Sequence, residues 1–384
     1  MDFSYTEEQL TIRQAARDFV RQECLPGVIE RDEHQKLPRE QLLKLAELGF
    51  LGMMVTPEYG GAGMDTVSYV LAMEEISKID SSVSVAMSVN NSLVCWGLQA
   101  YGSVLQKEKW LKHLAAGQKN GELYIGAFLL SEPEAGSDAT SQKTTAVDKG
   151  DHYVLNGMKN WITNGNSASV YLVMAHTDPA KGSKGINAFI VEKKSPGVSV
   201  GIKENKLGIR GSDTHSVSFN EVKVPKENRI GEDGFGFSFA MKTLSGGRIG
   251  IASQALGIAS GAYELSLKYV KERKAFGTEI KNHQIIQFKL ADMATRIEAA
   301  RLLCLKAALD KDNGRDYAIS SSMAKVFASE TAMWTTTEAV QIHGGYGYVK
   351  EYHVERLMRD AKITQIYEGT SEVQRIVISR SILK

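Results

Sequence analysis

The sequence predicts an α+β protein of three parts: an N-terminal α-helical domain, a central antiparallel β-domain and a C-terminal bundle of helices. Helical periodicity runs through the first third of the chain, β-branched runs of strand length fill the middle, and the helical period returns from Phe235 onward. These changes of pattern place the domain boundaries at residues 1–121, 122–235 and 236–384. A chain of 384 residues is long enough for two or three packing units.

Helix signals open the chain. Thr6 and Gln9 have the spacing of a capping box, and apolar residues then recur on one helical face from Ile12 to Val20. Pro38 stands where a second helix can begin. The glycine-rich stretch 60–63 separates that helix from a third helical segment rich in Met and Ala. The first third is therefore predicted to be a helical domain.

Strand signals dominate the middle third. Tyr124–Leu130 is an apolar run of strand length, and Asn156-Gly157 stands between two extended segments, which predicts a tight hairpin. The remaining strand candidates are rich in β-branched residues and are separated by turn residues: Val170–Ala175, Asn187–Glu192 and Val217–Val224. No helix-length segment separates them, so we expect a meander or barrel-like antiparallel domain rather than βαβ units.

Long helices are predicted at 236–275, 283–312 and 316–342, with connections short enough for an antiparallel bundle. Within the second of them, apolar residues are spaced alternately four and three apart, the pattern of a helix that packs along one seam. Cys304 lies on that seam, so we interpret it as a core residue and not as a nucleophile. The seam consists of Ile286, Leu290, Met293, Ile297, Ala300, Cys304 and Ala307.

Composition excludes several functions. A net charge of +1 gives no basic surface for nucleic acid or for an anionic membrane. Three cysteines without a CxxC pair argue against a disulfide framework and a zinc site, and no apolar run reaches the ~20 residues of a membrane helix. We find no hydrolase elbow, HExxH, Walker A or GxGxxG signature, and the eight histidines lack metal-ligand spacing. If the protein is an enzyme, we therefore expect a bound organic cofactor, and no metal, to carry its chemistry.

The N-terminus, MDFSYTEEQL, is acidic and leads directly into a helix signal. It has the features neither of a signal peptide nor of an Arg-rich transit peptide. We therefore expect a cytoplasmic protein, with the mitochondrial matrix as an alternative only if a transit peptide has been removed.

Five segments together resemble the acyl-CoA dehydrogenase family of flavoproteins. They are FLLSEPEAGSD at 128–138, WIT at 161–163, RKAFG at 273–277, QIHGG at 341–345 and RDAKITQIYEGT at 359–370. Their order and spacing extend over essentially the whole chain. The resemblance implies a C-terminal domain of four helices. It also implies non-covalent FAD held between the last two domains and a neighbouring subunit, in a homotetramer built as a dimer of dimers.

The resemblance also implies which residues contact FAD. One group lies along the flavin, with Ser137 shared by the CoA substrate: Phe128, Leu130, Ser131, Gly136, Ser137, Trp161, Ile162 and Thr163. A second group faces the dinucleotide of the neighbouring subunit, with Arg273 at its pyrophosphate: Arg273, Phe276, Gln284, Gln341, Gly344 and Gly345. Thr370, at the end of the last segment, and Glu372 just beyond it complete the implied FAD contacts. Ala275 stands where the family tends to have Thr, so one hydrogen bond to FAD is in question.

Glu368, in Tyr-Glu-Gly-Thr, matches the catalytic base of the family. The resemblance implies that this carboxylate takes the α-proton of an acyl-CoA thioester while the β-hydride passes to flavin N5, which gives a trans-2-enoyl-CoA. The backbone N–H of Glu368 and a flavin ribityl hydroxyl would hold the thioester oxygen, and enclosure should raise the carboxyl pKa toward neutrality. The substrate would be contacted by Ser137, Ser245, Arg248, Tyr367 and Gly369, with Ser245 replacing an Asp found in many relatives.

Branches of the family differ in where the base lies. Isovaleryl- and long-chain-type enzymes carry it before a helix Arg, but here Gly247 precedes Arg248. Glutaryl-type enzymes have an Arg where this chain has Ser84, which argues against a dicarboxylic substrate. The stretch 247–263 most resembles short-chain, butyryl-type members, with electron-transferring flavoprotein as the expected electron acceptor. The alternatives are a branched short-chain dehydrogenase, an acyl-CoA oxidase and, in a different class, a non-catalytic flavoprotein.

Overall fold

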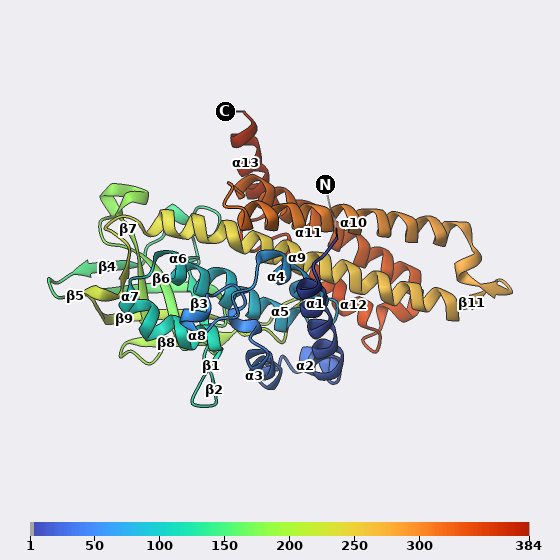
Figure 1. Ribbon diagram of the computed structural model, residues 1–384, viewed down its shortest axis with the longest axis horizontal. Helices are drawn as coiled ribbons and strands as arrows, with labels where there is room; N and C mark the ends of the chain where they lie inside the picture. The colour runs from blue at the N-terminus through green and yellow to red at the C-terminus, as the bar shows by residue number, and fades with distance from the viewer. Residues whose placement is uncertain (1–3, 384) are drawn as a thin grey trace.

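The computed structural model describes residues 4–383 and has the predicted order of helices, strands and helices (Figure 1). The molecule is elongated. The large sheet lies at one end, and the long helices of the C-terminal third extend from it to the other end. The predicted fold class, with an antiparallel central domain between two helical domains, is confirmed.

The N-terminal helices form as the sequence predicts. Helix α1 (Glu7–Phe19) begins at the Thr6 capping box, and α3 (Arg39–Glu47) begins directly after Pro38. Every residue of α4 (Thr66–Ser77) and α5 (Ser81–Ser88) is buried, so these two helices form the interior of the domain. The π-helical segment η4 (Val89–Cys95) continues α5. The shorter helices are α2 (Val28–Glu33), α6 (Trp96–Tyr101), α7 (Val104–Gln106) and α8 (Lys112–Ala116).

The central domain is one eight-stranded sheet in the order β10-β7-β6-β4-β5-β9-β8, with β3 paired to β6. Most pairs are antiparallel, as predicted, but β3 lies parallel to β6, and β4 meets β6 in a short parallel pairing. A simple meander is therefore excluded. The strands are β3 (Gly126–Leu129), β4 (Thr145–Asp148), β5 (His152–Thr163), β6 (Val170–His176), β7 (Ile186–Glu192), β8 (Val198–Lys203), β9 (Thr214–Pro225) and β10 (Arg229–Ile230).

The prediction of a hairpin at Asn156-Gly157 is wrong. Both residues lie inside β5, where the pairing with β9 shifts register between Leu155 and Gly157. The Asn156 side chain donates to Glu221 Oε1 (2.6 Å) and accepts from Glu221 N (2.9 Å), which ties the irregular region to β9. Gly157 has φ +142°, and a Cβ there would lie 2.7 Å from Thr144 Cα. The glycine therefore serves a bulge and a close backbone approach, not a turn.

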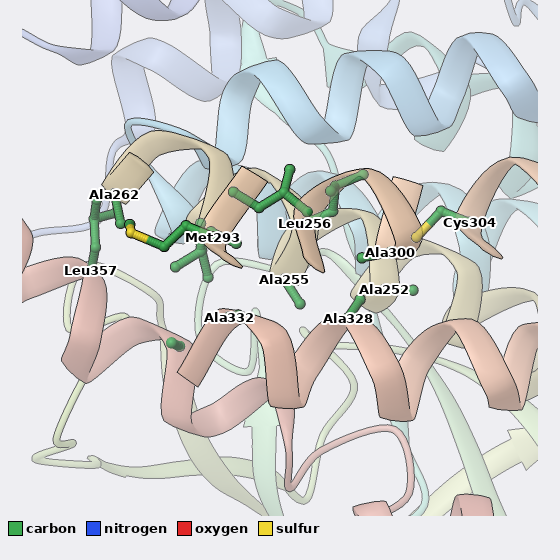
Figure 2. Close-up of a cluster of buried hydrophobic side chains, with 14 of the residues drawn as sticks. Ala252, Ala255, Leu256, Ala262, Met293, Ala300, Cys304, Ala328, Ala332 and Leu357 are labelled. Atoms are coloured by element: carbon green, nitrogen blue, oxygen red, sulfur yellow. The ribbon is translucent and has the colours of Figure 1, made fainter. Parts of the chain in front are cut away.

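Five helices make up the C-terminal part: α9 (Gly236–Glu272), α10 (Gln284–Asp312), α11 (Ala318–His343), α12 (His353–Thr364) and α13 (Ser371–Ile382). Alanine and other apolar side chains of α9, α10, α11 and α12 fill the space between these four helices (Figure 2). The predicted seam of α10 is confirmed from Met293 to Ala307, and Cys304 is a fully buried core residue. The two-stranded hairpin of β11 (Lys274–Ala275) and β12 (Thr278–Glu279) joins α9 to α10 at the end of the molecule farthest from the sheet (Figure 1).

Within residues 4–383, no helix combines the length and apolar character needed to cross a bilayer. Over the same range, no cluster of three or more His, Cys, Asp or Glu side chains could hold a metal ion. The three cysteines are buried and free.

Gly157→Ala should destabilise the protein by about 1–3 kcal/mol, since the new Cβ is strained by the backbone and meets Thr144. Denaturant unfolding measures the change. Gly150→Ala is the matched control, because φ is also positive there (+96°) but the space is open. An equal loss in both variants would mean that backbone strain alone, and not the close approach to β4, accounts for the cost.

Candidate active site

Glu368 lies on the turn between α12 and α13, with φ +55°, and Gly369 follows with φ +89°. Both values are in the left-handed region, which a glutamate adopts only when its surroundings hold it there. Gln374 provides part of that hold, because its Nε2 donates to the carbonyls of Glu368 (3.2 Å) and Gly369 (2.8 Å). Thr370 caps α13 by accepting from Val373 N. The turn is thus fixed from the helix that follows it.

The Glu368 side chain points toward α9. Its Oε2 is buried and has no hydrogen-bond partner among the described residues, although the residue as a whole is partly exposed. A Cβ at Gly247 would lie 1.8 Å from this oxygen, so only glycine leaves room for the carboxylate. Burial raises the pKa of Glu368 to about 7, while the positive charges of Lys325 and Arg248 oppose the rise.

Two buried cations stand beside Glu368. Arg248 lies next to Gly247 on α9, and its Nη1 is 3.4 Å from the hydroxyls of Ser245 and Ser322. Lys325, on α11, is fully buried and donates from Nζ to the Gly369 carbonyl at 2.7 Å. Burial lowers the pKa of both cations, and the charge of Glu368 counteracts this. Glu368 and each cation therefore favour one another's charged forms, whereas the charge of Arg248 opposes that of Lys325.

Polar side chains close the space along α9 beyond Gly247. A Cβ at Gly250, one turn farther, would meet Ser88 Oγ at 2.5 Å and the Tyr69 hydroxyl at 2.6 Å. One more turn along, Gln254 donates to Ser84 Oγ (3.0 Å) and accepts from the Tyr367 hydroxyl. Room for a chain that enters beside Glu368 thus ends within about two helical turns.

Around β3 and β5, the structure brings together the predicted flavin contacts. Asn160 N donates to Ser131 O at 2.9 Å, so the segment that carries Trp161 lies against the exit of β3. The Trp161 side chain is 59% exposed and its φ is +62°, whereas Ile162 is buried. The other members of the group are Phe128, Leu130, Gly136, Ser137 and Thr163, of which Gly136 and Ser137 are exposed.

These features fit a flat cofactor. A large aromatic surface is held outward on a strained backbone, and a Cβ at Gly136 would meet nothing within 4 Å. Helix α9 connects this group to Glu368: Phe239 stacks on Phe128 with ring centroids 6.3 Å apart, and the buried Thr243 Oγ1 nearby has no partner among residues 4–383. Helix α9 therefore extends from the predicted flavin contacts to the Glu368 turn.

The remaining predicted FAD contacts lie elsewhere. Arg273 follows α9, and its guanidinium lies over the Tyr346 ring at 5.5 Å, beside the exposed Gly344 and Gly345. Phe276 is 96% exposed at the tip of the β11–β12 hairpin. Gln284 and Gln341 are exposed at the start of α10 and near the end of α11. This hairpin and the sheet lie at opposite ends of the molecule, so the two groups do not meet within one chain (Figure 1).

Sequence reasoning missed Lys325, Gln254 and Gln374. A signal for Lys325 was present, because it lies on the small-residue face of α11, three or four positions from Ser321, Ser322, Ala328 and Ser329. A lysine on a core face is rarely without a buried partner. Gln254 and Gln374 gave no such signal, since glutamine is common on helix surfaces.

Three family models match the chain: the N-terminal domain of acyl-CoA dehydrogenase at residues 6–118, the middle domain at 127–222 and the C-terminal domain at 234–383. The fold and the site thus define a flavoprotein oxidoreductase. The chain belongs to the acyl-CoA dehydrogenase family, an FAD-dependent family, and FAD is its cofactor.

Individual relatives are similar over their full length. The short-chain specific acyl-CoA dehydrogenase of Clostridium acetobutylicum is 49% identical, with 100% of each chain covered. The structure of butyryl-CoA dehydrogenase from Megasphaera elsdenii matches with a TM-score of 0.97 at 47% identity, again covering 100% of both chains. A chain in a structure described as the electron transferring flavoprotein of Acidaminococcus fermentans matches with a TM-score of 0.98 at 50% identity, covering 100% of both.

Proposed function

We propose that the protein oxidises a short-chain acyl-CoA thioester to the trans-2-enoyl-CoA, with Glu368 as the base that removes the α-proton. The observation that carries this proposal is the buried Glu368 carboxylate, whose Oε2 has no partner among the described residues and whose pKa is about 7. A general base works best when its pKa lies near the working pH. Burial also raises the pKa of Asp360, to about 6, but its carboxylate accepts hydrogen bonds from Ile209 N and Arg356.

The chain's own groups account for the proton transfer. The α-proton of a thioester is weakly acidic, so its removal needs a base within hydrogen-bond reach and donors for the developing enolate oxygen. Glu368 provides the base, and we assign one donor to its backbone N–H. Tyr367 and Gly369 flank it on the turn, and Arg248 and Ser245 border the site from α9. FAD, when bound, supplies the acceptor for the β-hydride.

We assign the flavin to the residues around β3 and β5, and the dinucleotide to the residues around Arg273 of a neighbouring subunit. The separation of the two groups within one chain supports this division, because a single cofactor cannot contact both ends of the same molecule. Thr370 and Glu372, next to the catalytic turn, complete the assigned contacts. The arrangement requires at least a dimer, and a homotetramer remains our expectation.

A short acyl group is supported by the closure of α9 beyond Glu368, where Tyr69, Gln254 and Tyr367 occupy the space. The full-length similarity to a short-chain specific enzyme points the same way. Ser84, the position of the expected Arg in glutaryl-type enzymes, is buried and accepts from Gln254, which leaves no cation for a distal carboxylate there.

We further propose that electrons pass from the reduced enzyme to electron-transferring flavoprotein. The support is the similarity to a chain in the Acidaminococcus fermentans structure, whose description names electron transferring flavoprotein. We also propose a cytoplasmic location, because the similar proteins from Acidaminococcus fermentans and Clostridium acetobutylicum are bacterial.

Glu368→Gln should slow anaerobic flavin bleaching by butyryl-CoA by about 10⁴-fold, the upper end for loss of a general base, while substrate still perturbs the flavin spectrum. In the unaltered enzyme, kcat/KM should fall as pH drops through about 7, because protonated Glu368 cannot accept the α-proton. Glu330→Gln is the control, since it removes an exposed carboxylate of the neighbouring helix α11 that pairs with Arg375 and has no assigned role in the site. Bleaching at the native rate in Glu368→Gln would disprove the assignment of the base.

Gly247→Ala should displace the carboxylate, since the new Cβ would occupy the space of Glu368 Oε2, and the end of the Leu93 side chain, 2.8 Å from this Cβ, must also shift. A displacement of about 1 Å can cost about 10²-fold in rate, so we expect bleaching to slow by that order. Gly246→Ala is the matched control, because its Cβ would make only ordinary contacts, the nearest at 3.8 Å. Equal rates in the two variants would contradict the placement of the carboxylate against α9.

The acyl pocket is tested by anaerobic bleaching with butyryl-, isobutyryl-, 2-methylbutyryl- and octanoyl-CoA. Butyryl-CoA should react with the highest kcat/KM and octanoyl-CoA with the lowest, because α9 is closed within about two turns of Glu368. A preference for octanoyl-CoA would mean that Tyr69 and Gln254 move aside, and the short-chain assignment would then fail.

Arg273→Ala should weaken FAD retention, measured as flavin released during gel filtration. The lost guanidinium would otherwise pair with the cofactor pyrophosphate. Lys271→Ala, which removes an exposed charge two residues away, should retain FAD normally. A stable, FAD-saturated monomer in sedimentation would rule out a site shared between subunits.

A further inference from the structure

Lys325 is a buried cation that the chemistry above does not use. It lies near the middle of α11, its side chain is fully covered, and the residues around it on the same helix face are small. A lysine ammonium is strongly hydrated in water, so burying it is costly unless hydrogen bonds and opposite charge replace the lost water. The position of Lys325 therefore calls for a partner, and the structure provides one.

That partner is the turn that carries Glu368. Lys325 Nζ donates to the Gly369 carbonyl at 2.7 Å, and the same oxygen accepts from Gln374 Nε2 at 2.8 Å. Two donors from two different helices thus converge on the carbonyl of the Gly369–Thr370 peptide, one residue beyond Glu368. Because Glu368 and Gly369 both have positive φ, holding this carbonyl restrains the strained turn from which the Glu368 carboxylate extends.

Lys325 also acts through its charge. It and Arg248 are the two cations that oppose the effect of burial on the pKa of Glu368, and the influence of Lys325 is the larger. Arg248 is engaged on its own side by Ser245 and Ser322, whereas Lys325 contacts the turn itself. The other titratable groups that face this cluster come from five places: Tyr69 on α4, Tyr317 before α11, Asp360 on α12, the adjacent Tyr367 and Glu372 on α13.

We propose that Lys325 is a positioning residue for Glu368: its ammonium anchors the Gly369 carbonyl and supplies the positive charge that keeps the carboxylate in its proton-accepting form. This inference rests on the proposed role of Glu368 as the base. Lys325 itself exchanges no proton with the substrate. Its contribution is to the geometry of the turn and to the proton affinity of the neighbouring carboxylate.

The sign of the effect follows from the charges. Removing the ammonium removes an influence that lowers the pKa of Glu368, so this pKa should rise above its present value of about 7. A smaller fraction of the carboxylate is then ionised at neutral pH. The rate of bleaching should fall most at low pH and recover as the pH increases.

The experiment uses the FAD-loaded enzyme and Lys325→Met, which keeps an unbranched apolar stem and loses the charge. The pH dependence of anaerobic bleaching by butyryl-CoA should shift upward by about one unit, which corresponds to about tenfold slower reaction below the pKa. Infrared titration of the protonated carboxyl band, identified by its loss in Glu368→Gln, should report the same shift without turnover. Lys325→Arg, which retains charge and donors, should keep the native pH dependence.

Lys311→Met is the control, because burial also lowers the pKa of Lys311 but its ammonium lies beside Met54. It should leave the pH dependence unchanged. An unshifted profile and carboxyl band in folded, FAD-saturated Lys325→Met would overturn the inference, as would a loss of rate that is equal at every pH. The Glu368→Gln variant tests the base assignment separately. If it is inactive, that assignment stands whatever the result for Lys325→Met; if it reacts normally, the base assignment itself fails.

Discussion

The contact between the Glu368 turn and helix α9 is the constraint on which the site depends. The absence of a side chain at Gly247 leaves space for the carboxylate, and the carboxylate in turn fills it. The same helix extends over 37 residues, packs Phe239 against the strands and runs on into the bundle. Because this one helix contacts Glu368, the sheet and the helical core, these three parts cannot move independently of one another. Close packing of small residues therefore determines the geometry of the chemistry.

Much of the fold could be predicted from local patterns. The Thr6 capping box and the α10 seam depend on neighbours three or four residues apart, and both are observed. The prediction of a hairpin at Asn156-Gly157 failed because the same dipeptide suits both a turn and a bulge. Which of the two forms depends on pairing with strand β9, which is far away in sequence. The domain boundaries near residues 121 and 235 stay a prediction.

The residues of the site likewise fall into those that sequence patterns identify and those that only the structure reveals. Glu368 was identified by the segment around it, but its burial against α9 comes from a contact between residues more than a hundred positions apart. Lys325 and Gln374 act on backbone atoms of the turn, and no side-chain motif records such a contact. The separation of Arg273 from Trp161 is likewise a property of the whole molecule. Sequence patterns find groups that react, whereas the supporting groups become visible only in three dimensions.

The burial of all three cysteines has a practical consequence. Burial raises the pKa of each thiol, so Cys24, Cys95 and Cys304 are poor nucleophiles at neutral pH. Maleimide reagents should therefore not react with the native cysteines of the folded chain. A single cysteine introduced at an exposed position such as Lys109 could then carry a fluorophore or spin label without prior removal of the native thiols. The protein is thus already suited to site-directed labelling, in a background that needs no further engineering.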